Sequence, residues 1–494
     1  MQLLRKILFY TFAVIYLILC PLIILYAFGF VFRPGTKDGV VQTGIIYVAT
    51  APSGATIYMN NTRFTKTAPA VIWELLPGNY SIKADLKDYL PWEETVPVEA
   101  EKATVLDNIL LLPRDWESET LLTGKYQELV PVPETTLLIL KKGDKLGDVL
   151  VGDYEKGEAW PLVEAGSPFE DLKISTYFLM NKSTAVFVQV LSPGGDKFLW
   201  IELQEKQNIV KDITGLIQLP PEHVEWTADM THLFIYRGGQ LDRVDVSSGA
   251  VYPEYLPGIR GFGLSNGDVY VLKEDNTFIR TDIDKKGSSM LLDDPELGKT
   301  IFAGKGFYRI RPLNGNIILF IGKDGQLLAN RLPYHFVDKG LRGFDYYPQL
   351  ERVLVWTRDS IGILDFSTEK TGNAEFEKGP ALMWVYTRGK NIEQAFWAYG
   401  TSHILFRDGD EIFLLTLDTY GEFKLDQVFK VKKSDILYSD KNGKMYFLSR
   451  ADGELLSTEI VPVEKIISAP LPEMKEIKKK KIEELWDSSL QPTS

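Results

Sequence analysis

The hydrophobic pattern begins with an almost unbroken apolar run near the start of the chain. Residues Ile7–Phe32 hold 23 hydrophobic residues in 26 positions and no charged side chain. A helix of this length rises about 39 Å, which exceeds the roughly 30 Å hydrocarbon core of a bilayer. We therefore predict a transmembrane helix over residues 7–32. A cleaved signal peptide is the alternative, because Ala27-Phe28-Gly29 loosely resembles a cleavage site.

Positive charge on the two sides of this run indicates its orientation. The amino terminus and two basic residues precede it, and Arg33 and Lys37 follow it, so the difference in charge is small. We expect residues 1–6 to lie in the cytoplasm. The rest of the chain, after a polar linker over residues 33–43, is expected on the other side of the membrane.

Short strands and turns alternate over residues 44–113. Pro52-Ser53-Gly54 and Pro77-Gly78 are typical turn sequences between segments in which apolar and polar residues alternate. The expected strands are 44–50, 56–59, 70–74, 79–85, 93–98 and 104–111. Strands of this length, so closely spaced, predict a small all-β sandwich.

Four motifs in this stretch occur in a fixed order: PSGA (52–55), IYMNN (57–61), LPGNYSI (76–82) and DYLPW (88–92). The segment resembles the PEGA domain, a family of small sandwiches in prokaryotic surface and envelope proteins. The resemblance implies an envelope location and carries over no catalytic residue. Asp88 departs from the family pattern, which commonly has glycine there. Turn geometry and core packing explain the matching positions, which are Pro52, Gly54, Ala55, Tyr58, Pro77, Gly78, Tyr80, Tyr89 and Trp92.

Apolar strand cores recur at a regular distance over residues 114–465. Eight of them begin at Thr136, Thr184, Thr231, Gly267, Gly315, Glu351, Ser402 and Gly443. Their starts lie 36 to 51 residues apart, with a mean of about 44, and 40 to 50 residues is the length of a four-stranded propeller blade. Several cores are followed by a turn that runs from aspartate to glycine, such as Asp245 to Gly249 and Asp418 to Gly421.

The fold class predicted from these patterns is mainly β. It combines an N-terminal transmembrane helix, a small PEGA-like β-sandwich and a seven- or eight-bladed β-propeller. Two stacked sandwiches are the alternative to the propeller, because the repeat is uneven. Residues 466–494 are polar and rich in lysine and glutamate, and we expect a disordered tail there.

Composition narrows the range of functions. The net charge is −12, from 67 acidic and 55 basic residues, so the chain has no general positive field with which to bind nucleic acid. The single cysteine, Cys20, lies in the apolar run, which excludes an intrachain disulfide and a zinc site built on cysteines. Only four histidines are present, which argues against a histidine-rich metal centre.

The motifs that suggest catalysis are incomplete. Gly263-Leu264-Ser265-Asn266-Gly267 fits G-x-S-x-G, but a strand core follows it where a nucleophile elbow needs a helix. Gly298-Lys299-Thr300 lacks the earlier glycine of a phosphate loop. His232 and His403 occupy matching repeat positions, which indicates a structural role. The same role is predicted for five tryptophans beside strand cores, expected to pack between blades instead of forming a sugar-stacking platform: Trp200, Trp226, Trp356, Trp384 and Trp397.

These observations favour a non-catalytic function, with no catalytic residue, cofactor or metal site. We expect a single-pass protein of a prokaryotic cell envelope, held in the membrane by residues 7–32, whose propeller presents a face to an extracytoplasmic protein or glycan. An envelope hydrolase with its active site in the propeller channel is the alternative. A propeller that only braces a larger complex is a third possibility.

Overall fold

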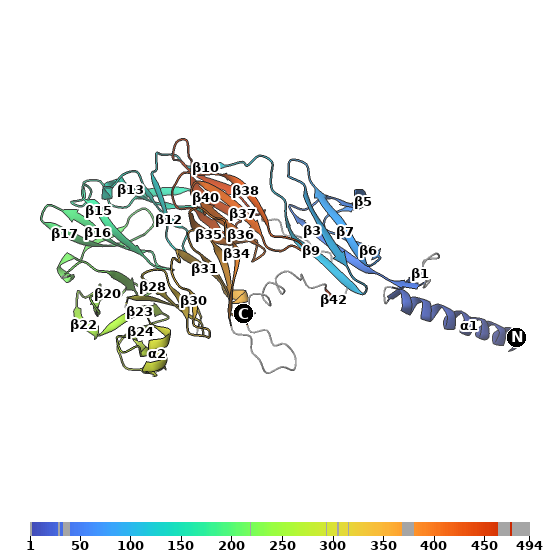
Figure 1. The fold of residues 1–494 in the computed structure, drawn as a ribbon. Coiled ribbons are helices and arrows are strands. Elements are labelled where there is room, and N and C mark those ends of the chain that lie inside the picture. The colour runs from blue at the N-terminus through green and yellow to red at the C-terminus, as the bar shows by residue number, and fades with distance from the viewer. Residues whose placement is uncertain are drawn as a thin grey trace.

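The computed structural model describes most of the 494-residue chain. Figure 1 shows a long helix, a β-sandwich and a larger ring of β-sheets in sequence order. The described residues are 2–27, 30–32, 40–217, 219–292, 294–303, 306–314, 316–367, 380–462 and 475–476. Most of the predicted linker and tail therefore lies outside the described residues.

Helix α1, Gln2–Ala27, carries the predicted membrane span. Its segment Ile7–Ile24 has a mean hydropathy of 2.6, is not buried against the rest of the protein, and is long and apolar enough to cross a membrane. The helix has the predicted length but begins and ends five residues earlier than the predicted 7–32. Phe30–Phe32 forms strand β1 instead, which pairs with β2, Val40–Gln42. Gly29 separates the two elements in the sequence, and glycine is a poor helix former.

The sandwich consists of two four-stranded sheets. One has the order β42-β9-β3-β6 and the other β5-β4-β7-β8. Their strands are β3 Gly44–Ala51, β4 Thr56–Met59, β5 Thr62–Thr67, β6 Ala70–Leu75, β7 Gly78–Asp85, β8 Trp92–Val98, β9 Lys102–Leu110 and β42 Lys475–Glu476. Strand β5 is absent from the prediction because its residues, TRFTKT, are mostly polar and exposed. Ile46, Ile57 and Val96 lie in the core between the sheets.

The part of the propeller that the structure describes contains eight four-stranded units, each made of antiparallel neighbours. The first strands are β11 Glu128–Pro131, β15 Lys173–Leu179, β19 His223–Trp226, β23 Ile259–Ser265, β27 Tyr308–Pro312, β31 Gly343–Tyr347, β35 Ile392–Ala398 and β39 Leu437–Ser439. The second strands are β12 Leu137–Lys141, β16 Ala185–Ser192, β20 His232–Arg237, β24 Asp268–Lys273, β28 Ile318–Gly322, β32 Arg352–Trp356, β36 His403–Asp408 and β40 Lys444–Leu448.

The third strands are β13 Val149–Asp153, β17 Gly195–Glu202, β21 Gln240–Asp245, β25 Phe278–Asp282, β29 Leu327–Ala329, β33 Ile361–Asp365, β37 Glu411–Thr416 and β41 Leu455–Glu459. The fourth are β14 Glu158–Pro161, β18 Ile209–Asp212, β22 Val251–Pro257, β26 Ser288–Leu292, β30 His335–Val337, β34 Ala381–Tyr386, β38 Lys424–Lys430 and, in the eighth blade, β10 Glu119–Leu122. Helix α2, Pro295–Ile301, and short 3₁₀ turns at Leu146–Asp148, Thr214–Leu216 and Pro348–Leu350 connect strands.

First strands of neighbouring blades approach one another around the axis of the ring. Strands β23 and β27 come close enough to pair in parallel, which joins the fourth and fifth blades into one eight-stranded sheet. Gly263 of β23 allows this approach, because a Cβ atom there would lie 1.9 Å from the carbonyl oxygen of Ile310. The first strands therefore line the centre of the ring.

The chain closes the ring by pairing its two ends. The eighth blade has the order β10-β41-β40-β39, so a strand from the start of the propeller is hydrogen-bonded to its last strand. The hydroxyl groups of Ser118 and Thr458 lie 2.6 Å apart beside this pair. Both ends of the propeller segment must be present for the eighth blade to form.

Four of the five tryptophans predicted to pack between blades are buried. Trp200 and Trp226 meet edge to face at 5.1 Å between ring centres, and Trp356 and Trp397 belong to one core cluster of the sixth and seventh blades. Trp384 is the exception, since it is 40% exposed on the outermost strand of the sixth blade. The prediction of inter-blade packing is wrong for this residue.

The sandwich packs directly against the seventh and eighth blades. Leu110 and Leu112, at the end of the sandwich, lie in the same hydrophobic cluster as Leu405 and Leu414 of the seventh blade. The contact places the sandwich between helix α1 and the propeller (Figure 1). The packing of apolar side chains fixes the position of the propeller relative to the sandwich.

A turn of the seventh blade completes this junction with polar contacts. The phenol of Tyr420 donates to the carbonyl oxygen of Val105, at 3.1 Å, and accepts from its amide at 3.0 Å. Glu94 accepts from the backbone amides of Tyr420 and Gly421, and Asn108 donates to Asp418 at 2.8 Å. The aspartate-to-glycine turn from Asp418 to Gly421 therefore also connects the propeller to the sandwich.

Candidate functional site

An ion pair joins the first strands of the third and fifth blades. Glu225, on the first strand of the third blade, has no exposed side-chain surface and pairs with Arg311 on the first strand of the fifth blade. His223 lies 3.0 Å from the same carboxylate. The backbone amide of Leu264, on the blade between them, donates to the other oxygen at 3.1 Å. One carboxylate thus links three consecutive blades.

Electrostatics at the axis keep this carboxylate ionised. Burial alone would raise the pKa of Glu225, but Arg311 and the hydrogen bond with His223 outweigh it, so the pKa is lowered. Arg309, two residues before Arg311, keeps part of its surface in contact with solvent, but protein atoms surround it closely. The loss of hydration that this causes and the charge of Arg311 both lower its pKa. The centre of the ring therefore carries a satisfied ion pair beside a second guanidinium.

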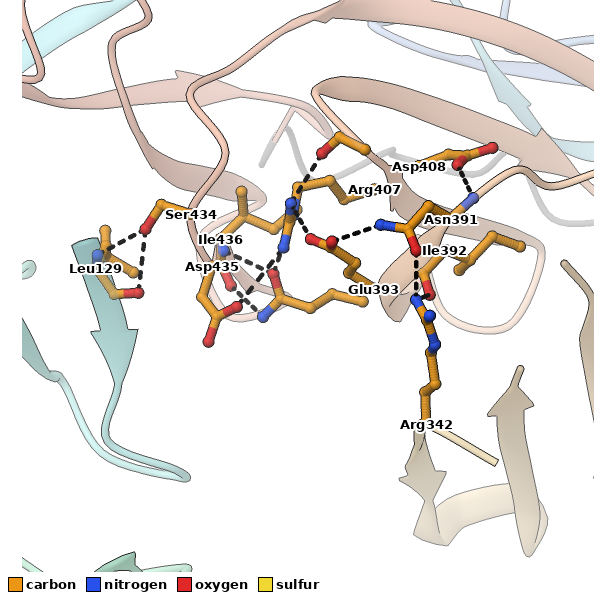
Figure 2. A network of polar contacts seen from close by, with 12 residues as sticks. Leu129, Arg342, Asn391, Ile392, Glu393, Arg407, Asp408, Ser434, Asp435 and Ile436 are labelled. Atoms are coloured by element: carbon orange, nitrogen blue, oxygen red, sulfur yellow. Dashed lines mark hydrogen bonds and ion pairs between the residues drawn. The ribbon is translucent and has the colours of Figure 1, made fainter. Parts of the chain in front are cut away.

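A polar network joins the last three blades of the propeller to one another (Figure 2). Arg407, 3% exposed, pairs with Glu393 and, at 3.6 Å, with Asp435. Asn391 donates to Glu393 at 2.6 Å and accepts from Arg342, of the sixth blade, at 2.9 Å. The network therefore connects the sixth, seventh and eighth blades.

The same network reaches the first blade. The hydroxyl of Ser434 accepts from the amide of Leu129 at 2.6 Å. Burial raises the pKa of the neighbouring Asp435, although Arg407 opposes the rise and the negative charge of Glu128 adds to it. Glu128 is itself paired with Lys141 at 3.0 Å. Arg407 pairs with Asp435 across the seventh and eighth blades, whereas Glu393 and Glu128 pair with basic residues of their own blades. All three carboxylates have partners, so the cluster is first of all a structural seam between blades.

The two histidines at matching repeat positions have matching contacts. Nδ1 of His232 lies 2.7 Å from the hydroxyl of Thr231, and Nδ1 of His403 lies 2.8 Å from that of Ser402. Each begins the second strand of its blade. Among the described residues, no group of three or more His, Cys, Asp or Glu side chains is placed to hold a metal ion.

His403 provides a test by pH. Burial lowers its pKa from 6.5 to about 4, although Asp418 partly opposes this. The neutral form is thus favoured in the folded state, so its stabilising effect is complete above pH 6.5 and is lost as the pH falls toward 4. We expect a loss of about 3 kcal/mol in the free energy of unfolding over that range.

The measurement is denaturant unfolding at several pH values on the His403→Gln variant, which removes this titration. We expect a flatter pH dependence between pH 6.5 and 4. His335→Gln, at an exposed position, is the control and should keep the slope of the parent. An unchanged slope in His403→Gln would mean that other groups cause the acid sensitivity.

The PEGA-motif positions lie mainly at turns and around the sandwich core. Gly54 has φ +87°, which glycine adopts readily, and Ala55 is fully buried. The phenol of Tyr80 donates to the carbonyl oxygen of Leu76 at 2.9 Å. The remaining positions divide by location: Pro52, Pro77 and Gly78 lie at strand ends, Tyr89 and Trp92 pack at the edge of the core, and Tyr58 lies half-exposed beneath Lys83.

The incomplete catalytic motifs form ordinary structural elements. Ser265 ends strand β23, and the turn at Asn266-Gly267 leads straight into β24, so no helix follows the serine. Gly298-Lys299-Thr300 lies inside helix α2. Sequence reasoning missed the residues that the structure brings together at the axis, because Glu225 and Arg311 are 86 positions apart.

Solved structures with a similar overall arrangement are β-propellers. The β-propeller domain of Myceliophteria thermophila Cps50 (Swd1) is 9% identical, with a TM-score of 0.34, 70% of this chain and 99% of that chain being covered. Kluyveromyces lactis Hsv2 is 8% identical, with a TM-score of 0.38 and coverage of 62% and 98%. The eight four-stranded units are the direct observation of the propeller fold, and similarity at this level adds nothing to it.

Comparison by sequence is informative for the sandwich alone. No curated protein matches the chain. The match to a family model begins just before strand β3 and ends with strand β9, in agreement with the resemblance of the four motifs. Residues 43–110 are a PEGA domain, and the chain joins this domain to a β-propeller.

Proposed function

We propose that this chain is a membrane-anchored, non-catalytic binding or scaffold protein of a prokaryotic cell envelope, which presents a propeller face to a protein or glycan. The observation that carries the proposal is the junction between the two domains. Leu110 and Leu112 pack into the seventh blade while Tyr420 reaches back to the sandwich. A propeller fixed in this way keeps a constant position relative to the sandwich, as a presenting module requires.

The orientation can be tested with one engineered thiol. Lys125 is exposed on the propeller, and Cys20, the single native cysteine, lies in the apolar helix. In intact cells, Lys125→Cys in the full chain is expected to react with a membrane-impermeant maleimide, while the parent protein stays unlabelled. Labelling that requires cell lysis would place the propeller in the cytoplasm and contradict the proposal.

The hydrolase alternative has one observation in its favour. Glu128, Glu393 and Asp435 gather at the seam of the ring, and the pKa of Asp435 is raised. Full-length protein in detergent or nanodiscs can be incubated with envelope glycans and peptides and assayed for both retention and cleavage. The proposal expects saturable retention with intact ligand. Cleavage that disappears in Asp435→Asn would establish the hydrolase instead.

A further inference from the structure

A groove of about 970 Å³ separates the outer parts of the fifth and sixth blades. The segment Phe336–Gly340 lines one side, and the turn Thr357–Ser360 with Trp384 lines the other. Both sides come from outer strands and the turns beside them, so the groove does not belong to the central ion pair or the seam network. Its volume lies within the roughly 300–1,000 Å³ of ligand sites.

The groove exposes an indole ring. Trp384 is 40% exposed, whereas Trp200, Trp226, Trp356 and Trp397 are at most 8% exposed. An indole offers a wide flat apolar face on which another flat or ring-shaped group can stack. Since burying an indole stabilises a fold, its exposure beside a groove is the feature that most needs a ligand to explain it.

Hydrogen-bonding groups near the indole are available to a ligand. Asp324 and Asp338 are exposed, and neither carboxylate bonds to another residue in the described part of the chain. Gln326 accepts from the phenol of Tyr308 at 3.1 Å through its oxygen, which leaves its amide to donate. Asp359, in contrast, already accepts from the hydroxyls of its own turn.

We propose that this groove binds a neutral glycan chain. A sugar has an apolar C–H face, which stacks on Trp384, and adjacent hydroxyl groups, which donate to the carboxylates of Asp324 and Asp338. Hydrogen bonds to an ionised acceptor are stronger than those between neutral groups. The inference rests on the proposed binding function and gives it a site and a ligand class.

The charge of the groove selects among glycans. Asp324, Asp338 and Asp359 outnumber Lys339 and Arg358, which leaves one net negative charge along the lining. Glycans with carboxylate or phosphate groups are therefore disfavoured relative to neutral ones. The groove is open to solvent, so it also accommodates a chain longer than the part that it holds, as a polysaccharide is.

In the test, full-length protein in nanodiscs is titrated with short neutral oligosaccharides of hexose and N-acetylhexosamine. Calorimetry and tryptophan fluorescence measure the binding. Trp384→Ala is expected to weaken binding by about tenfold or more and to abolish the fluorescence change. Trp384→Phe should restore part of the affinity. Trp73→Ala is the matched control, because Trp73 is 54% exposed on the sandwich, away from the groove.

A second variant tests the carboxylates. The double variant Asp324→Asn with Asp338→Asn keeps the shape of the groove. It is expected to weaken the binding of neutral sugars and to reduce the discrimination against acidic sugars. Equal sugar binding by the parent and the Trp384→Ala variant would contradict the assignment of the binding site to this groove, while leaving the proposed binding function in place. Absence of binding to every sugar would also overturn the glycan inference. Saturable retention of an envelope protein by the same preparation would then still support the proposed function.

Discussion

A chain that stops after Asp452 is expected to lose the folded propeller. The truncation removes strand β41, which is the partner of both β10 and β40 in the eighth blade. Leu455, Ile460 and Val461 are at most 7% exposed and would be lost with it. Burial of such side chains stabilises by about 1.5–3 kcal/mol each, so their loss alone costs about 6 kcal/mol, which is a large part of the stability of a typical domain.

The matched control is a chain that stops after Pro462. It lacks the whole polar tail, residues 466–494, including β42, but retains β41, so its ring can close. Thermal unfolding by circular dichroism and limited proteolysis should show the parent transition for this control and rapid digestion of residues 114–452 in the shorter chain. Similar melting of both chains would mean that the ring is stable when open and that β10 does not act as a closing strand.

The blade repeat was readable from the sequence because each blade has a single most apolar strand. All eight predicted strand cores overlap second strands, from β12 to β40. A second strand lies between two others, so both its edges and its faces are buried and its sequence is nearly continuous in apolar residues. The uneven spacing left seven or eight blades open, and the pairing of β10 with β41 gives eight in the described chain.

The elements that were not predicted lack this apolar signal. Strand β5 is exposed and polar, and its place is visible only from its pairing with β4. Trp384 looks like the other tryptophans in sequence, since each lies in or beside a strand. Whether a strand lies inside a blade or at its outer edge depends on sheet order. Exposure of this side chain is therefore a property of the tertiary structure.

Long-range polar contacts were equally hidden. The sequence identifies the segment containing Tyr420 only as an aspartate-to-glycine turn, but its phenol bonds to Val105, 315 positions earlier. One sequence without relatives cannot indicate which distant residues meet. Periodicity predicts the most apolar strand of each blade and an approximate number of blades, and the functional surface arises from contacts that periodicity does not encode.

The Arg311→Met variant is expected to lose about 3–5 kcal/mol of unfolding free energy near neutral pH, the cost of leaving a buried charge without its partner. Glu225 is fully buried, and only His223 and the amide of Leu264 would remain to stabilise its carboxylate. Lys145→Met breaks an exposed ion pair, in which the two side chains are 56% and 88% exposed, and serves as the control. The free energy of unfolding of the Lys145→Met control should fall by no more than about 1 kcal/mol.

The dependence on pH distinguishes this mechanism from loss of packing. In the parent, Arg311 and His223 hold the pKa of Glu225 below its usual value, so the pair stabilises above the unfolded-state pKa and this contribution declines as the pH falls. Without Arg311, burial raises the pKa, and protonation in acid should bring the variant closer to the parent. The double variant Arg311→Met with Glu225→Gln should recover much of the loss at neutral pH, because no buried charge remains. Equal instability of the single and double variants at every pH would show that Arg311 acts through its packing, and that the charge of Glu225 does not hold the three blades together.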